Sequence, residues 1–409
     1  MKIVILTNEY PPYVYGGAGV HVEYLTRELA KLDDGRHEIQ IKCFGDQRID
    51  EGNLHVQGVE PTMKLPALSD PRHGKFLDTI LRDLMMVGSI ESADVVHCHT
   101  WYSHYAGCLA RQLFGAPLVL STHSLEPHRP WKAEQLGTAY NASTWVEKTA
   151  YQNADGVIAV SKSMKKDVHD LYDVPEDKIH VIYNGIDLDQ YKPTPDEAVL
   201  REFGIDPCKP FILFVGRITR QKGIIHLVNA IPYIESGVQI VLCAGAPDTK
   251  EISMEMEEAV TKARAKSDNP IIWIAEMLPK DKVITLYSMA SIFVCPSVYE
   301  PFGIINLEAM ACETPVVASA VGGIREVVIP EETGLLVPIH ARGETDFEPV
   351  EPDQFSQGLA RAVNRLISHP EIMKSMAKKS RERVEKYFSW TSIARQTLDF
   401  YQELINQRK

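Results

Sequence analysis

The sequence predicts an α/β protein built from two parallel-sheet domains in series. Short apolar runs, which are typical of buried strands, alternate with amphipathic helical runs along most of the 409 residues. The series also begins a second time, because a clear buried-strand run follows Pro210 after a proline-rich, acidic stretch. We therefore expect two similar domains that face a central cleft, with the chemistry on the loops at the carboxyl ends of their strands.

The first half contains strand-like runs separated by helical patterns. Between the first two runs, Val22, Leu25, Leu29 and Leu32 follow one another at steps of three, four and three, which places them on one face of a helix. This alternation assigns residues 1–187 to an N-terminal domain with a parallel sheet. The strand candidates are residues 2–7, 39–44, 95–99, 118–122, 157–160 and 180–183.

The second half repeats the pattern, with residues 210–385 as its domain. Residues 188–209 are rich in proline and acidic side chains, which predicts a linker. From about residue 352 the pattern is helical only, and no strand follows the last segment, residues 386–409. We expect that helix to pack back on the first domain. The strand candidates are residues 211–216, 239–244, 271–275, 292–295, 316–318 and 335–337.

Composition excludes several classes of function. A net charge of -12, from 43 basic and 55 acidic residues, argues against a protein that binds nucleic acid without sequence preference. The seven cysteines are odd in number and form no Cys-x-x-Cys pair, so we expect neither a disulfide framework nor a zinc site. The apolar start is too short for a signal peptide, and no apolar run approaches the length of a membrane span. We expect a cytoplasmic protein without membrane partners; no motif indicates an oligomeric state.

The most informative motif is a pair of glutamates eight residues apart, Glu300 and Glu308. Glu300 follows an apolar strand, and the turn residues Pro301 and Gly303 precede a helical run that carries Glu308. The N–H groups at a helix start favour an anion, and carboxylates bind sugar hydroxyls well. The motif predicts a nucleotide-sugar site, with the diphosphate on the helix start. A pair of glutamates on a solvated helix face is the alternative. We predict that Glu300 is catalytic. The predicted donor-binding residues are Gly303, Ile304, Ile305 and Glu308.

Two cations follow the first strand of the second half. Arg217 ends that strand, and Lys222 precedes the next helix. An arginine fork and a lysine point charge can together neutralise a leaving diphosphate, although most such cations are only surface charges. We predict that both residues are catalytic.

A glycine-rich loop follows the first strand of the chain. Gly16, Gly17 and Gly19 allow close approach of the backbone to a phosphate or sugar, although the dinucleotide fingerprint is not met. A plain strand-to-helix turn is the alternative. We predict that Gly16 and Gly17 bind the donor and that Glu9 and Tyr15, near this loop, bind the acceptor.

Three histidines, His97, His99 and His123, lie at or near strand ends. His123 ends a strand at the expected cleft, so we predict that it is catalytic. No carboxylate accompanies these histidines at ligand spacing, and the Asp-x-Asp sequence at Asp187 lies in the predicted linker. We therefore expect no metal site and no cofactor.

Together these segments resemble the retaining glycosyltransferases of family four, which have the GT-B fold of two Rossmann-like domains. The matching parts are residues 16–19, 184–187, 215–223 and 300–308, so the resemblance spans nearly the whole chain. Residues 9–22 and 123–132 are similar to the actinobacterial-type glycogen synthases of this family, also described as α-maltose-1-phosphate synthases.

The resemblance implies a hexosyltransferase that moves glucose from ADP-glucose into α-1,4 linkages with retention. It assigns the Gly17 backbone, Arg217 and Lys222 to the diphosphate, His123 and Glu300 to the glucose, and Glu308 to the ribose. The expected acceptor is glucose 1-phosphate or an α-glucan chain. Arg129 and Lys132, which cluster with His128 in one loop, suit a phosphorylated acceptor; binding to acidic neighbours such as Glu126 is the alternative reading of these cations.

Other functions stay open on the sequence. A sugar-nucleotide epimerase or hydrolase of the same fold needs added acid and base residues, and it would form product without an acceptor. A family-four transferase could use another donor, such as UDP-glucose or GDP-mannose. A non-catalytic carbohydrate-binding protein would bind without turnover, and a pyridoxal-phosphate phosphorylase would show the absorbance of its cofactor.

Overall fold

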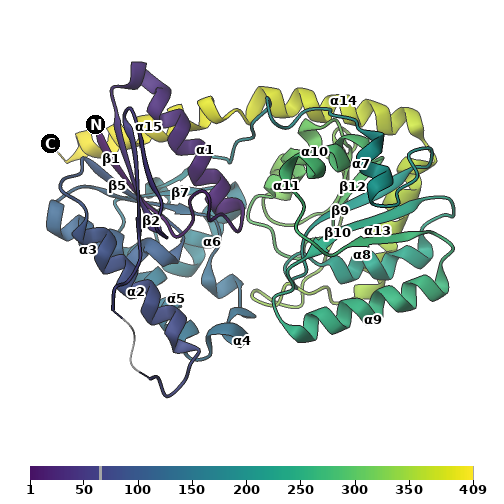
Figure 1. Cartoon of the computed structure of the whole chain (residues 1–409), viewed down its shortest axis with the longest axis horizontal. Helices are drawn as coiled ribbons and strands as arrows, with labels where there is room; N and C mark the ends of the chain where they lie inside the picture. Colours follow the sequence, from purple (N-terminus) through teal and green to yellow (C-terminus); the bar gives the residue numbers. More distant parts are fainter. Residues whose placement is uncertain (64–66, 409) are drawn as a thin grey trace. The chain divides into compact units, whose positions relative to one another are not determined.

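The computed structural model describes residues 1–63 and 67–408, which form two compact units. Unit 1 contains residues 1–185 and the C-terminal helix, and unit 2 contains residues 186–389. Each unit is a sheet of mainly parallel strands covered by helices (Figure 1). The predicted fold class is confirmed in this respect.

The sheet of unit 1 has the order β3-β4-β2-β1-β5-β6-β7-β8 in the described residues. Its neighbouring strands are parallel except for the pair of β3 and β4 at one edge. The strands are β1 (Lys2–Leu6), β2 (Glu38–Phe44), β3 (Arg48–Glu51), β4 (Leu54–Val59), β5 (Val95–His99), β6 (Leu118–Thr122), β7 (Gly156–Ala159) and β8 (Ile179–Val181).

The helices of unit 1 connect these strands, and the last one ends the chain. They are α1 (Gly17–Lys31), α2 (His73–Gly88), α3 (His104–Phe114), α4 (Lys132–Leu136), α5 (Ala139–Asn153), α6 (Lys162–Tyr172) and α15 (Trp390–Gln407). Short 3₁₀ turns add η1 (Leu32–Gly35), η2 (Trp101–Ser103), η3 (Glu126–His128) and η4 (Glu176–Lys178).

The sheet of unit 2 has the order β11-β10-β9-β12-β13-β14 in the described residues. Its strands are β9 (Phe211–Arg217), β10 (Gln239–Gly245), β11 (Ile271–Ile274), β12 (Ile292–Cys295), β13 (Val316–Ser319) and β14 (Gly334–Val337). Its helices are α7 (Glu197–Glu202), α8 (Ile224–Ala230), α9 (Lys250–Lys266), α10 (Lys280–Met289), α11 (Ile304–Ala311), α12 (Ile324–Val327), α13 (Pro352–Ile367) and α14 (Pro370–Tyr387), with the turn η5 (Ile231–Tyr233).

The structure differs from the sequence prediction in two places. The edge strand β3 and its neighbour β4 were not predicted. β3 is polar and largely exposed, and β4 alternates buried and partly buried residues, so neither contains a continuous apolar run. The segment predicted as a linker, residues 188–209, instead belongs to unit 2 and contains α7. Leu200 and Ile205 of this segment are buried, so their apolar side chains anchor it to the unit.

The C-terminal helix α15 is part of unit 1 and lies beside α1 (Figure 1). Trp390, Leu398 and Tyr401 of this helix join one apolar core with Ile3 and Ile5 of β1. The burial of these large side chains fixes the end of the chain on the sheet where the chain begins.

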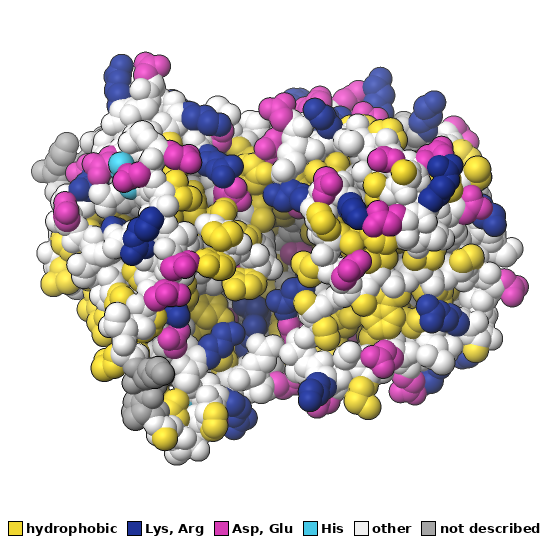
Figure 2. Space-filling model, in the orientation of Figure 1, with side chains coloured by type: hydrophobic (Ala, Val, Ile, Leu, Met, Phe, Trp, Pro, Cys, Tyr) yellow, Lys and Arg dark blue, Asp and Glu magenta, His cyan; other side chains and the backbone are white. Residues whose placement is uncertain are grey.

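The described residues include no helix that combines the length and the apolarity needed to cross a bilayer. On the visible face of each unit, Lys and Arg side chains are interspersed with Asp and Glu (Figure 2). That face therefore offers no extended basic surface of the kind that nucleic-acid binding requires.

Candidate functional site

In unit 2, the two predicted charges of opposite sign meet at the strand ends. The Nζ of Lys222 donates to Oε2 of Glu300 at 2.7 Å, and the side chains are only 23% and 9% exposed. Ser297 also donates to this oxygen, at 3.3 Å. Burial is the largest single influence and would lower the pKa of Lys222, but the charge of Glu300, a contribution from Cys295 and the hydrogen bond to Glu300 together outweigh it, so the net pKa is raised. Lys222 therefore keeps its positive charge at neutral pH.

The turn between Glu300 and α11 depends on glycines. Gly303 immediately precedes α11 with a φ of 96°, in the region that favours glycine. Gly322, which follows β13, also has a positive φ, and a Cβ there would lie 2.1 Å from the carbonyl oxygen of Glu300. The N–H of Gly323 donates to that carbonyl at 3.0 Å. The loop after β13 thus holds the backbone of Glu300 in place, which the sequence did not indicate.

Glu308 lies on α11, where two tyrosines donate to its carboxylate. The hydroxyl of Tyr191 reaches Oε1 and that of Tyr287 reaches Oε2, both at 3.0 Å. Burial raises the pKa of Glu308, and the two hydroxyl donors only partly oppose this effect. Tyr191 comes from the predicted linker, so this segment helps to build the site.

Arg217 has a partner that the sequence analysis missed. Its guanidinium forms a short ion pair with Asp248, which lies in the loop between β10 and α9, and its side chain is 41% exposed. Arg217 is also near enough to Lys222 for its charge to act on the pKa of that lysine. Both predicted cations are therefore gathered in unit 2, but each has its own carboxylate.

In unit 1, the strand ends carry a buried cluster of histidines. His99 Nδ1 and His123 Nε2 are hydrogen-bonded at 3.0 Å, and His21 Nδ1 is hydrogen-bonded to Asn184 Oδ1 at 2.6 Å. His97 lies beside His99, with ring centroids 4.1 Å apart. Burial lowers the pKa of His21 to about 4, and it holds the pKa of His99 and His123 well below the ordinary value. These rings are neutral at physiological pH.

The glycine loop of unit 1 is organised around Glu9. Its Oε2 accepts from the N–H groups of Tyr15 at 2.8 Å and Gly16 at 3.0 Å. Gly17 begins α1, and a Cβ at Gly19 would lie 2.7 Å from the same carboxylate oxygen. Glu9, which was predicted to bind the acceptor, therefore shapes the loop that was predicted to bind the donor. The side chain of Tyr15, the other predicted acceptor-binding residue near this loop, is exposed.

The loop with the predicted acceptor-binding cations is folded on its own acidic neighbours. Arg129 Nη1 lies 3.5 Å from Glu126 Oε1, and Lys132 donates to Gln135 at 3.1 Å. Glu126 is buried, and its N–H donates to Glu147 Oε2 at 2.8 Å. The alternative reading of Arg129, an ion pair with Glu126, is therefore realised in this structure.

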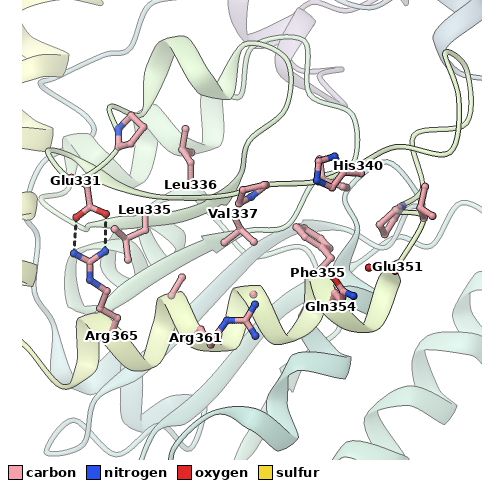
Figure 3. A pocket seen from close by; sticks show the side chains of 17 residues that line it. Glu331, Leu335, Leu336, Val337, His340, Glu351, Gln354, Phe355, Arg361 and Arg365 are labelled. Atoms are coloured by element: carbon pink, nitrogen blue, oxygen red, sulfur yellow. Dashed lines mark hydrogen bonds and ion pairs between the residues drawn. The ribbon is translucent and has the colours of Figure 1, made fainter.

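A well-defined pocket in unit 2 does not coincide with either cluster. It has a volume of about 620 Å³ and lies between β14 and α13 in unit 2 (Figure 3). Arg365 closes one end by binding Glu331 through two hydrogen bonds of 2.7 Å. None of the predicted site residues lines this pocket.

Comparison with known proteins identifies the family. Residues 15–190 match the model described as Glycosyltransferase Family 4, and residues 196–345 match the model described as Glycosyl transferases group 1. The α-maltose-1-phosphate synthase of Mycolicibacterium smegmatis is 47% identical over 408 residues, which cover 99% of this chain and 100% of that protein. The chain belongs to glycosyltransferase family 4. The resemblance seen in the sequence is confirmed.

This family-4 glycosyltransferase also has more distant relatives. The glycogen synthase of Mycobacterium tuberculosis is 27% identical over 425 residues, covering 98% of this chain and 94% of that protein. The solved structure of sucrose-phosphate synthase from Thermosynechococcus elongatus has a TM-score of 0.78 and 25% identity, and the match covers 100% of both chains. These matches confirm the GT-B fold class, and the protein is an enzyme of glycosyl transfer.

Sequence reasoning found the charged side chains of the site but missed several of their partners. Asp248 lies near the carboxyl end of β10, and Arg217 lies at the carboxyl end of the neighbouring β9. These positions could have indicated that the two residues are partners. Asn184 was noticed only as part of a motif, whereas the structure shows that it orients His21. His21 gave no signal of its own, because a histidine on an apolar helix face resembles an ordinary core residue.

Proposed function

We propose that this family-4 glycosyltransferase moves glucose from ADP-glucose to glucose 1-phosphate or to the end of an α-glucan, forming an α-1,4 linkage with retention. The similarity to an α-maltose-1-phosphate synthase and to a glycogen synthase supports this choice of product. The observation in the structure that carries the proposal is the buried Lys222–Glu300 pair, because it offers a fixed cation to a leaving diphosphate and a carboxylate to a sugar.

On this proposal, unit 2 binds most of the donor. Lys222 and Arg217 contact the diphosphate together with the N–H groups at the start of α11, at Gly303, Ile304 and Ile305. Glu308 contacts the ribose with the lone pairs that its tyrosine donors leave open. The bond from Lys222 uses Oε2 of Glu300, so Oε1 is available to a glucose hydroxyl. The backbone of Gly17 contributes to the diphosphate from unit 1.

The proposed reaction develops charge at two places. The bond between C1 and the diphosphate oxygen lengthens, the sugar becomes oxocarbenium-like, and negative charge grows on the leaving oxygen. Lys222 and Arg217 stabilise that oxygen because they are already held in position by carboxylates before the reaction begins. The acceptor hydroxyl attacks the face that the diphosphate leaves, and its proton passes to the departing phosphate.

Unit 1 supplies a neutral histidine to the glucose and a set of polar and charged groups to the acceptor in the same reaction. His123 positions the glucose through a hydrogen bond, and its neutrality avoids repulsion of the positive charge that develops on the sugar. Arg129 and Lys132 belong to the loop that we propose to contact the acceptor, with Glu9 and Tyr15 completing the acceptor side.

Turnover is proposed to need no metal ion, because Lys222 and Arg217 supply the positive charge that a divalent cation would otherwise give. We expect unchanged release of ADP after treatment with EDTA. Loss of activity in EDTA and its recovery with Mn²⁺ would contradict this part of the proposal.

A matrix of donors and acceptors tests the proposed function. ADP-glucose, UDP-glucose and GDP-mannose are each incubated with glucose 1-phosphate, with glycogen or without acceptor, and the released nucleotide is measured. We expect ADP release that depends on an acceptor, with UDP-glucose as the poorer donor. Conversion of the sugar nucleotide without any acceptor would instead indicate an epimerase or hydrolase.

A further inference from the structure

His21, His99 and His123 of unit 1 lie close together, and the proposed transfer assigns a role only to His123. His21, His99 and His123 each offer a ring nitrogen within 4.8 Å of those of the other two. Among residues 1–63 and 67–408, this is the one group of three or more His, Cys, Asp or Glu side chains whose ligand atoms lie close enough together to hold a metal ion. They reach the same place from α1, from the end of β5 and from the residue after β6.

Two of the rings have a buried nitrogen without a partner among the described residues. These atoms are Nε2 of His21, which is a candidate ligand, and Nε2 of His99, which is not, because it is Nδ1 of His99 that faces His123. The side-chain oxygen Oδ1 of Asn184 can only accept a hydrogen bond, so Nδ1 of His21 carries a proton. Nε2 of this neutral ring therefore carries a lone pair. A buried lone pair that accepts no hydrogen bond is destabilising unless a ligand binds to it.

We propose that His21, His99 and His123 bind a transition-metal ion of the Zn²⁺ class, and that this ion inhibits sugar transfer by immobilising His123. Binding is independent of the proposed function, whereas the inhibition rests on it. Imidazole nitrogens suit Zn²⁺, Cu²⁺ or Ni²⁺, and the absence of carboxylate ligands from this group disfavours Mg²⁺ and Mn²⁺.

One pair of the three rings already has the spacing that such an ion needs, and the full set of ligand nitrogens, within 4.8 Å of one another, would have to draw together. Two nitrogens at about 2.0–2.1 Å from a tetrahedral zinc are about 3.3 Å apart. His99 Nδ1 and His123 Nε2 are already 3.0 Å apart, and a shift of one proton to Nε2 of His99 leaves both facing nitrogens free to coordinate. The bond from Asn184 to His21 resembles the outer partners that orient metal-binding histidines in other proteins. His123 is partly exposed, which gives the ion a route of entry.

The binding test uses the full chain, freed of metal with EDTA and then dialysed. Zn²⁺ is titrated by calorimetry, and Co²⁺ is titrated while the visible absorption of four-coordinate cobalt is recorded. We expect one site per chain. His123→Ala and His21→Gln each remove one ligand and should weaken binding by more than the roughly 10–100-fold expected for Asn184→Ala, which removes only an outer partner.

The control is His55→Gln, which alters an exposed histidine beside Asp50 and should leave binding unchanged. Absence of a stoichiometric site in the wild type, or equal binding by the wild type and the folded His123→Ala variant, would overturn the proposal. If His21→Gln does not fold, the result for His123→Ala decides the test. His123 is the least buried of the three rings, so its replacement disturbs the core least.

Inhibition is measured separately on the wild type. One equivalent of Zn²⁺ should abolish ADP release, and EDTA should restore it. Binding of Zn²⁺ without inhibition would refute the second half of the proposal. Metal-free protein that releases no nucleotide from any donor would instead contradict the proposed function and leave the binding result intact.

Discussion

The two units place titratable side chains at the ends of parallel strands, but they treat charge in opposite ways. In unit 1, His21 and His99 are buried, His123 is partly exposed beside them, and all three rings are neutral. In unit 2, the side chain of Lys222 is only 23% exposed, yet it remains charged because Glu300 lies 2.7 Å away. The difference shows that burial alone does not decide the protonation state of a strand-end residue. A partner of opposite charge decides it.

The same contrast appears in a second pair of groups. Glu147 in unit 1 is buried beside Glu126, and burial, with the charge of Glu126 as a second cause, raises the pKa of Glu147 to about 8. In unit 2, Arg217 faces Asp248, as Lys222 faces Glu300. Unit 2 therefore holds its two cations beside carboxylates, whereas the histidine cluster of unit 1 is neutral.

The largest effect should follow from breaking the charged pair of unit 2. Lys222→Ala removes a cation from the proposed leaving group, and it leaves Glu300 buried without its partner. We expect kcat to fall on the order of 10²–10³-fold, the usual loss for one charge-stabilising group. Arg217→Ala should behave similarly. Steady-state ADP release is the measurement, and Arg220→Ala, an exposed neighbour paired with Glu255, is the matched control. Equal rates for Lys222→Ala and the control would place the donor elsewhere.

Removing a neutral group of unit 1 should have a smaller effect. His123→Ala deletes a hydrogen bond to the proposed glucose without deleting a charge. We expect kcat/KM to fall about 5–150-fold, which corresponds to roughly 1–3 kcal/mol. His73→Ala, at an exposed position in the same unit, should be unchanged. A loss as large as that of Lys222→Ala would show that the ring acts through charge after all.

The comparison also predicts how stability depends on pH. The folded protein keeps a proton on Glu147 up to about pH 8, whereas the unfolded chain releases it near the ordinary value of 4.5. The contribution of this group to stability therefore falls as pH rises through that window. Glu147→Gln cannot titrate, so its stability relative to the wild type should increase between pH 5 and pH 8, by a few kcal/mol at most.

Urea unfolding of both proteins at pH 5, 6.5 and 8 measures this difference. The exposed Glu134→Gln serves as the control and should follow the wild type at each pH. Parallel profiles for Glu147→Gln and the wild type would mean that Glu147 is charged in the folded state.

The smallest expected effect concerns the acceptor. Lys132 donates to Gln135 at 3.1 Å, and an ammonium group carries three donors and a full positive charge that a phosphate can bind. Lys132→Ala should raise KM for glucose 1-phosphate several-fold and leave glycogen extension nearly unchanged, because a charge-assisted bond to phosphate is about twice as strong as a neutral one. Lys148→Ala, exposed on α5, is the control. Equal losses with both acceptors would exclude a specific role in binding phosphate.

Local sequence patterns predicted the fold class, the positions of most strands along the chain and the charged residues of unit 2. Buried parallel strands leave continuous apolar runs, and glycine or proline marks the turns that follow them, so both signals are local. The strands β3 and β4 were missed because neither leaves a continuous apolar run. β3 is polar and exposed, and β4 alternates buried and partly buried residues.

Only the tertiary structure decided which side chains are partners and which of them are charged. Lys222 and Glu300 are 78 residues apart, and His21 and Asn184 are 163 residues apart. Parallel topology brings such distant positions to one edge of a sheet, and no local pattern records the pairing. Protonation follows from burial and from the charge of the nearest partner, and both are properties of the folded chain.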